Sequence, residues 1–208
     1  MANQNRPQIY LQTPLRLDLD TFPTALNAVL DGAEIACLRL TTAASTPEQI
    51  RHNADILRDI AHGRDISLVI DSHYRLVQPL GLDGVHLLDG AKQIREAHKV
   101  LGKDCIIGAY CGSSRHVGMS AAEMTADYVA FGPIVADPLL GDGLKAELDL
   151  FQWWSDMIEV PVVAEGGLSL ESLDVLARCT DFICLGDEIW NHDDGAAAAI
   201  KAFSARLA

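Results

Sequence analysis

Residues 161–169 read Pro-Val-Val-Ala-Glu-Gly-Gly-Leu-Ser, a short apolar run that ends in two glycines just before a serine. The run is continuous rather than alternating, which is typical of a strand covered on both faces. The two glycines allow a tight turn, and Ser169 precedes leucines at helical spacing, as expected for a helix N-cap. The stretch therefore predicts one strand–turn–helix unit of a parallel α/β fold.

The same unit recurs from end to end. An acidic residue precedes or enters alternate apolar runs. No glycine-rich G-x-G-x-x-G follows the first run, so an open doubly wound sheet is the less favoured alternative. Eight runs predict an α/β fold that is a single (βα)8 TIM barrel domain over residues 1–208, with residues 1–7 as a loose N-terminal extension. The runs are Ile9–Gln12, Glu34–Leu40, Ile66–Asp71, Asp83–Leu87, Cys105–Tyr110, Asp127–Phe131, Pro161–Ala164 and Asp181–Leu185.

The helix signals between the runs are specific. Thr46 precedes Pro47 and lies three residues before Gln49, which predicts an N-cap with a capping box. The last helix is predicted from about Asp194 to Leu207. Trp153 and Trp154 are adjacent on a predicted helix, so at most one faces the core, and the other is a candidate contact in a homo-oligomer.

Composition and charge exclude several classes of protein. The formal net charge of −13 disfavours a nucleic-acid partner, because phosphate backbones need clustered Lys and Arg. Met1–Pro7 lacks the apolar segment of a secretion signal, and no apolar run reaches the roughly 18–20 residues of a membrane span. We therefore expect a cytoplasmic protein without a membrane partner. The five cysteines form no C-x-x-C pair, and Cys111, at a strand end, is the candidate reactive thiol.

The functional residues of such a barrel lie just after its strands. Gly166 and Gly167 expose backbone amides that favour a phosphate site, completed by Gly186 after the eighth run, although the glycines also suit a plain tight turn. Four acids stand at strand ends as a candidate metal site or as solvated loop acids: Asp71, Asp89, Glu165 and Asp187. His86 ends the fourth run as a candidate catalytic residue or a structural one.

Several blocks together resemble one known family, the thiamine-phosphate synthases and thiazole tautomerases. The resemblance covers Ile9 to about Ile189. It rests on Ile9–Thr13, Leu38-Arg39, Asp83–Leu87 (Asp-Gly-Val-His-Leu), Ile107-Gly108, Asp127–Ile134 (Asp-Tyr-Val-Ala-Phe-Gly-Pro-Ile) and Pro161–Gly167. It implies a TIM barrel that joins hydroxymethylpyrimidine pyrophosphate to thiazole phosphate and expels pyrophosphate with the help of Mg²⁺. Its partner is then a small phosphorylated heterocycle.

The same resemblance assigns roles to single residues. It implies that Arg39 contacts pyrophosphate, and that Gly166, Gly167 and Gly186 hold a phosphate. Ser72 and Ala91 occupy the places of the family's two Mg²⁺-binding aspartates, so the resemblance leaves Asp71 and Asp89 as the neighbouring candidate ligands.

Other family positions also differ in this sequence. The lysine that follows the family's arginine strand is Thr41 here, and Gly186-Asp187-Glu188 stands where a serine helps to hold the thiazole phosphate.

Two alternatives to the synthase remain at the level of sequence. One is a tautomerase-like or re-purposed barrel enzyme that uses acid–base chemistry at Tyr110, Cys111 or His116. The other is a non-catalytic barrel that binds a small molecule or a partner protein.

Overall fold

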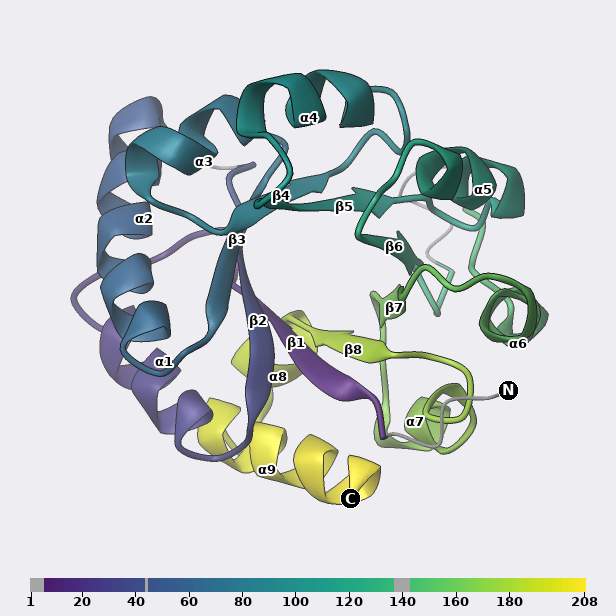
Figure 1. Cartoon of the computed structure of the whole chain (residues 1–208). Coiled ribbons are helices and arrows are strands. Elements are labelled where there is room, and N and C mark those ends of the chain that lie inside the picture. The colour runs from purple at the N-terminus through teal and green to yellow at the C-terminus, as the bar shows by residue number, and fades with distance from the viewer. Residues whose placement is uncertain (1–5, 44, 137–142) are drawn as a thin grey trace.

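The computed structural model describes residues 6–43, 45–136 and 143–208, and over these residues the chain forms a closed barrel of eight parallel strands. Each strand pairs with the next in sequence, and β8 pairs with β1. Seen along the barrel axis, helices surround the ring of strands (Figure 1). The predicted (βα)8 barrel is therefore confirmed, and the open sheet is excluded.

The strands are β1 (Gln8–Gln12), β2 (Ile35–Leu40), β3 (Ser67–Asp71), β4 (Gly84–Leu87), β5 (Ile106–Tyr110), β6 (Tyr128–Phe131), β7 (Val162–Glu165) and β8 (Phe182–Leu185). The helices are α1 (Phe22–Leu30), α2 (Pro47–His62), α3 (Tyr74–Leu80), α4 (Ile94–Leu101), α5 (Arg115–Glu123), α6 (Leu148–Met157), α7 (Leu170–Leu176), α8 (Asp187–Trp190) and α9 (Ala196–Leu207).

Three of the repeated acids tie neighbouring strands together at the N-terminal end of the barrel. Each stands immediately before an even-numbered strand, and its carboxylate accepts the backbone N–H of a residue near the start of the preceding strand. The pairs are Asp83 with Leu68 (2.6 Å), Asp127 with Ile107 (2.7 Å) and Asp181 with Val162 (2.8 Å). These bonds explain the acidic repeat, and they explain why β4, β6 and β8 begin one residue later than the predicted runs.

The helix signals are confirmed where capping is strong. The Thr46 hydroxyl accepts the N–H of Gln49 at 3.3 Å, and the Gln49 side chain accepts the N–H of Thr46 at 2.8 Å. The start of the last helix was predicted wrongly, because Gly195 has a φ of 84° and α9 begins only at Ala196. In the described ranges, no helix is long and apolar enough to cross a membrane.

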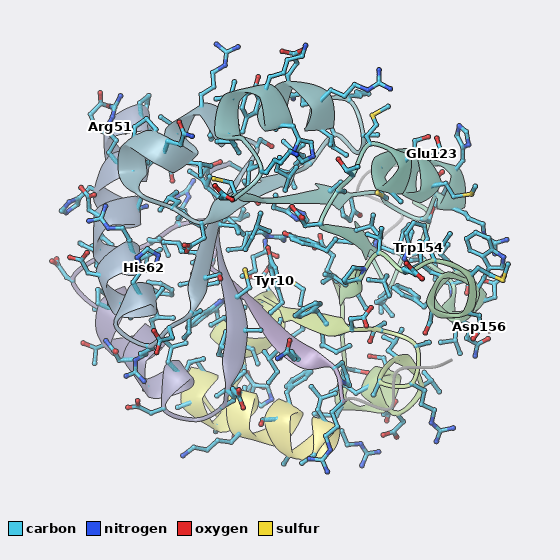
Figure 2. The ribbon with its side chains drawn as sticks, in the orientation of Figure 1. Tyr10, Arg51, His62, Glu123, Trp154 and Asp156 are labelled. Atoms are coloured by element: carbon cyan, nitrogen blue, oxygen red, sulfur yellow. The ribbon has the colours of Figure 1, made fainter. Side chains whose placement is uncertain are left out.

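Two apolar layers hold the barrel. A large one lies between strands and helices, and Trp154 is fully buried in it, with its indole N–H donating to the Val160 carbonyl at 2.8 Å. Trp153 instead lies half-buried beside Arg115, whose guanidinium carbon is 4.2 Å from the indole ring centre. A smaller layer fills the inside of the barrel and includes Tyr10, which Figure 2 shows within the ring of strands.

Candidate active site

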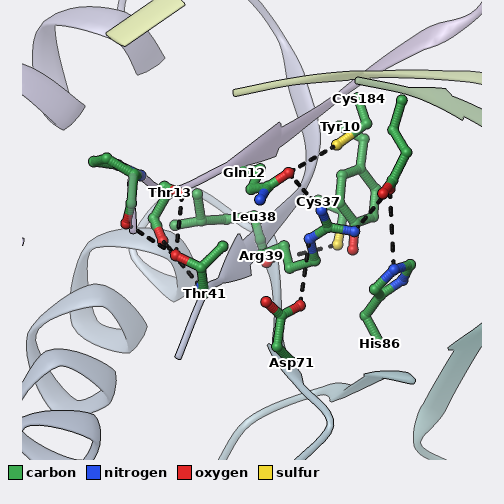
Figure 3. A network of polar contacts seen from close by, with 12 residues as sticks. Tyr10, Gln12, Thr13, Cys37, Leu38, Arg39, Thr41, Asp71, His86 and Cys184 are labelled. Carbon is green, nitrogen blue, oxygen red and sulfur yellow. Dashed lines mark hydrogen bonds and ion pairs between the residues drawn. The ribbon is translucent and has the colours of Figure 1, made fainter. Parts of the chain in front are cut away.

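Arg39 is the centre of a buried polar cluster inside the C-terminal end of the barrel, which we call the mouth. Its guanidinium comes from β2 and is 3% exposed. Nη1 donates to Glu165 Oε2 at 2.8 Å, Nη2 donates to Gln12 Oε1, and Nε lies 3.5 Å from Asp71 Oδ1 (Figure 3). We call these four residues the Arg39 cluster.

Strand register explains how the Arg39 cluster assembles. Gln12 and Arg39 are direct neighbours in the β1–β2 pairing, and Asp71 ends the next strand, β3. Glu165 reaches the guanidinium from β7, which is not a neighbour of β2 in the barrel. A buried charge is costly unless it is paired and hydrogen-bonded, and here one cation meets two carboxylates.

The electrostatics of the Arg39 cluster leave it acidic. Burial raises the pKa of Asp71 to about 6; the Arg39 guanidinium opposes this rise, and the Glu165 charge adds to it. Two carboxyl groups thus face a single guanidinium, and at pH 7 Asp71 lies above its pKa. Glu165 is the most accessible of the three charged groups, with a side chain 13% exposed against 3% for Arg39 and 6% for Asp71.

His86 lies next to the Arg39 cluster and is fully buried. Its Nδ1 is 2.9 Å from the Tyr128 hydroxyl, which is itself 2.8 Å from the Tyr10 hydroxyl. Its Nε2 is 4.0 Å from Glu165 Oε2, and burial lowers the pKa of the ring well below its usual value. His86 is thus a neutral imidazole that is hydrogen-bonded to Tyr128 through Nδ1, whereas its buried Nε2 faces Glu165 without a hydrogen-bond partner among the described residues.

The loops after β7 and β8 form a second feature of the mouth, a set of inward backbone amides that we call the amide nest. Gly167 and Leu168 donate to Glu188 Oε1 at 2.8 and 2.9 Å, and Gly186 donates to Glu188 Oε2 at 2.9 Å. Gly166 and Gly167 have φ values of 83° and 75°, which favour glycine and turn these amides. Two of the three amides implied to hold phosphate, those of Gly167 and Gly186, thus bind a carboxylate of the chain itself.

A pocket of about 230 Å³ adjoins the amide nest. Its lining combines the end of β1 with the loops after β7 and β8: Gln12, Thr13, Leu15, Gly166, Gly167, Cys184, Gly186, Asp187 and Glu188. Gln12 joins this pocket to the Arg39 cluster, so the two features form one site.

The candidate metal ligands are separate rather than clustered. Among the described residues, no group of three or more His, Cys, Asp or Glu side chains is placed to hold a metal ion. Asp71 faces Arg39, whereas Asp89 receives a hydrogen bond from Gln93 at 2.8 Å on Oδ2. Asp89 Oδ1 is buried and has no hydrogen-bond donor within the described part of the chain, so it retains lone pairs for a cation or water.

The remaining candidate groups lie on or just before α5. Cys111 is buried, and burial raises the pKa of its thiol to about 12, with a further rise from Glu165. Tyr110 donates its hydroxyl proton to the Gly132 carbonyl at 2.8 Å, and His116 is exposed on α5. A reactive thiol at Cys111 stays a prediction, for which this burial offers no support. Part of the 135–145 loop, residues 137–142, lies outside the described residues.

Sequence reasoning identified the amide nest but not its occupant. Glu188 was named only as part of the segment that replaces the family's serine, because a sequence does not show which way a side chain turns. Gln12 and Tyr128 were also missed as site residues. The alternation of strand residues was a usable signal for both, since every second residue of a barrel strand faces inward.

Comparison with known proteins shows the family of the chain. The sequence profile described as thiamine monophosphate synthase matches residues 9–189. The chain belongs to the thiamine monophosphate synthase family. This family member is 35% identical to the thiamine-phosphate synthase of Rhodospirillum centenum over 95% of its own length and 96% of the relative's. It is 32% identical to the thiamine-phosphate synthase of Erythrobacter litoralis, over 100% and 99% of the two chains.

Solved structures support the fold of this family member. The thiamine phosphate pyrophosphorylase from Pyrococcus furiosus superposes with a TM-score of 0.82 at 19% identity, covering 96% of this chain and 95% of the other. The orotidine 5'-phosphate decarboxylase from Pyrococcus horikoshii reaches a TM-score of 0.68 at 15% identity, over 95% and 98% of the chains. At these identities the similarity concerns the barrel and not the reaction.

Proposed function

We propose that this chain catalyses the coupling step of thiamine biosynthesis, in which hydroxymethylpyrimidine pyrophosphate is joined to a thiazole and pyrophosphate is released. The observation that carries the proposal is the end-to-end similarity to thiamine-phosphate synthases, 35% identity over 95% of this chain in one case. It favours the synthase over a tautomerase-like enzyme and over a non-catalytic barrel. The large negative charge favours solubility, and we propose that the protein acts in the cytoplasm.

The chemistry places opposite electrostatic demands on the two substrates. The thiazole nitrogen donates its lone pair to the methylene carbon of the pyrimidine, and the bond from that carbon to the pyrophosphate oxygen breaks. Pyrophosphate leaves with the bonding electrons, and the neutral thiazole becomes a thiazolium cation. An enzyme gains rate from groups that are complementary to the charge that develops in the transition state.

Glu165 suits the developing thiazolium. It is the most accessible acid of the Arg39 cluster, and that cluster carries more negative than positive charge when both of its carboxylates are ionised. Attraction between Glu165 and a cation at the mouth is strengthened because water is largely excluded there. We assign Glu165 to this role, with its carboxylate held by the hydrogen bond from Arg39 Nη1.

Arg39 and Asp89 suit the pyrophosphate side. Arg39 Nη2 is bound to Gln12, a neutral acceptor that yields to an anion more readily than Glu165 does. Asp89 is suited to be one carboxylate ligand of Mg²⁺, because a Mg²⁺ ion bound to a polyphosphate needs only one or two protein carboxylates. When bound, Mg²⁺ neutralises charge on the leaving pyrophosphate. Asp71 balances Arg39, and Cys111 receives no role in this account.

Complementation of a thiamine auxotroph tests the proposal. The host lacks only its own synthase, and the medium contains thiazole alcohol, so that both the alcohol and its phosphate are available. We expect the wild-type chain to restore growth without thiamine, and Arg39→Met to fail. Arg51→Met, on the exposed face of α2, is the matched control and should support growth. Absence of growth with wild-type protein that is expressed and folded would refute the proposed function.

A further inference from the structure

Glu188 is the best-connected acid of the mouth that the proposed reaction does not use. Both of its carboxylate oxygens are bound: Oε1 accepts the N–H groups of Gly167 and Leu168, and Oε2 accepts that of Gly186. The three distances lie between 2.8 and 2.9 Å, which are those of strong hydrogen bonds to an ionised acceptor. The amide nest is therefore satisfied by the protein before any ligand arrives.

A phosphate group would meet two obstacles at this place. It needs the same N–H donors, so Glu188 must first leave them. The displaced carboxylate then remains beside a phosphate that is mainly a dianion at neutral pH, with Asp187 also in the pocket lining and Glu165 at the end of β7. The described lining of the pocket contains no Lys or Arg to offset this charge.

A hydroxyl group meets neither obstacle. A carboxylate has about four lone-pair sites on its two oxygens, and the three amides use three of them. Glu188 can therefore accept one more hydrogen bond, but it cannot donate one while ionised. The ligand group that fits is a donor, which an alcohol is and a phosphate dianion is not. The pocket beside it, about 230 Å³, also contains the carboxylate of Asp187.

We propose that Glu188 is a specificity-determining residue that fills the amide nest, so that this enzyme couples the thiazole as its free alcohol and releases unphosphorylated thiamine. The inference rests on the proposed function and names the acceptor substrate of the same site. The bonds formed and broken are those given above, and the hydroxyl group of the thiazole is untouched. The acidic pocket also matches the positive charge of the thiazolium product.

Titration with inorganic phosphate, followed by calorimetry, tests Glu188 without reference to turnover. We expect Glu188→Ala to bind phosphate at least tenfold more tightly than the wild type, because it frees three N–H donors and removes a charge. Asp187→Ala is the matched control: it also removes one charge but leaves the amide nest filled, and it should gain less than threefold. Equal phosphate affinity of the wild type and Glu188→Ala would overturn the proposal.

Substrate competition then tests the acceptor. With Mg²⁺ and hydroxymethylpyrimidine pyrophosphate, the wild type should show a higher kcat/KM for thiazole alcohol than for thiazole phosphate, and Glu188→Ala should shift that ratio at least tenfold toward the phosphate. Glu188→Gln, which keeps the side-chain length, should shift this ratio of kcat/KM values in the same direction. It replaces the alanine variant in the test if that variant does not fold. An unchanged ratio would overturn the proposal. If neither thiazole is coupled by any variant, the proposed function fails, and the phosphate titration with direct binding of thiazole alcohol decides the role of Glu188.

Discussion

Replacing Arg39 by Met is the most severe test of the Arg39 cluster. The substitution leaves two carboxylates, with side chains 6% and 13% exposed, without the cation that now lies 3.5 and 2.8 Å from them. Breaking a buried ion pair by removing one partner costs about 3–5 kcal/mol, because the other charge is left desolvated. We expect a loss of this size in the free energy of unfolding at pH 7.5, measured by urea denaturation.

The pH dependence of that loss identifies its cause. The Asp71 pKa is about 6 with Arg39 present, and removal of the guanidinium raises it further. As pH falls below about 6, Asp71 of the variant takes up a proton, so the loss should shrink there. The double variant Arg39→Met with Glu165→Gln should recover part of the stability at pH 7.5. Lys99→Met breaks an exposed pair with Glu96, with side chains 68% and 58% exposed, and should cost less than about 1 kcal/mol. A loss for Arg39→Met no larger than that of the control would refute the reasoning.

Three further predictions concern single groups. Because burial raises the folded-state pKa of Asp71 from 3.8 to about 6, the folded protein keeps a proton that the unfolded chain releases. The free energy of unfolding of the wild type should therefore fall by about 2 kcal/mol as pH rises from 4 to 6, relative to that of Asp71→Asn. If the free energies of unfolding of the two proteins changed equally with pH across this range, the result would contradict this prediction. Iodoacetamide at pH 7.5 should label Cys111 much more slowly than the half-buried Cys105, as read by peptide mass spectrometry, because burial holds the pKa of Cys111 at about 12; equal rates would contradict its burial. Asp127→Ala should lower the free energy of unfolding by about 1 kcal/mol and speed hydrogen exchange at the Ile107 amide, and unchanged exchange there would contradict the role given to that carboxylate.

The barrel was predictable because its signals are local and repeated. Continuous apolar runs, Gly166-Gly167 after a strand, and the Thr46–Gln49 capping box each report on neighbouring residues, and their order along the chain specifies parallel strands with helical crossovers. The start of α9 was missed because Gly195 adopts a positive φ, which glycine permits but does not require.

The site was only partly predictable, because its bonds join distant segments. Sequence position brought Arg39, Asp71 and Glu165 to strand ends, but the ion pair between β2 and β7 depends on the width of the closed barrel. The filling of the amide nest by Glu188 depends on one side-chain direction, and no spacing rule encodes it. The sequence pattern thus predicted where the candidate site lies, and side-chain packing determines which of its groups remain available to a ligand.

The coupling reaction itself is the most direct measurement of the account. The purified chain is given Mg²⁺, hydroxymethylpyrimidine pyrophosphate and thiazole alcohol, and the products are analysed by mass spectrometry with a parallel assay of pyrophosphate. The account predicts thiamine and pyrophosphate in equal amounts, with no product when either heterocycle is omitted. Folded protein that yields neither a coupled product nor pyrophosphate, with thiazole alcohol or with thiazole phosphate, would contradict it.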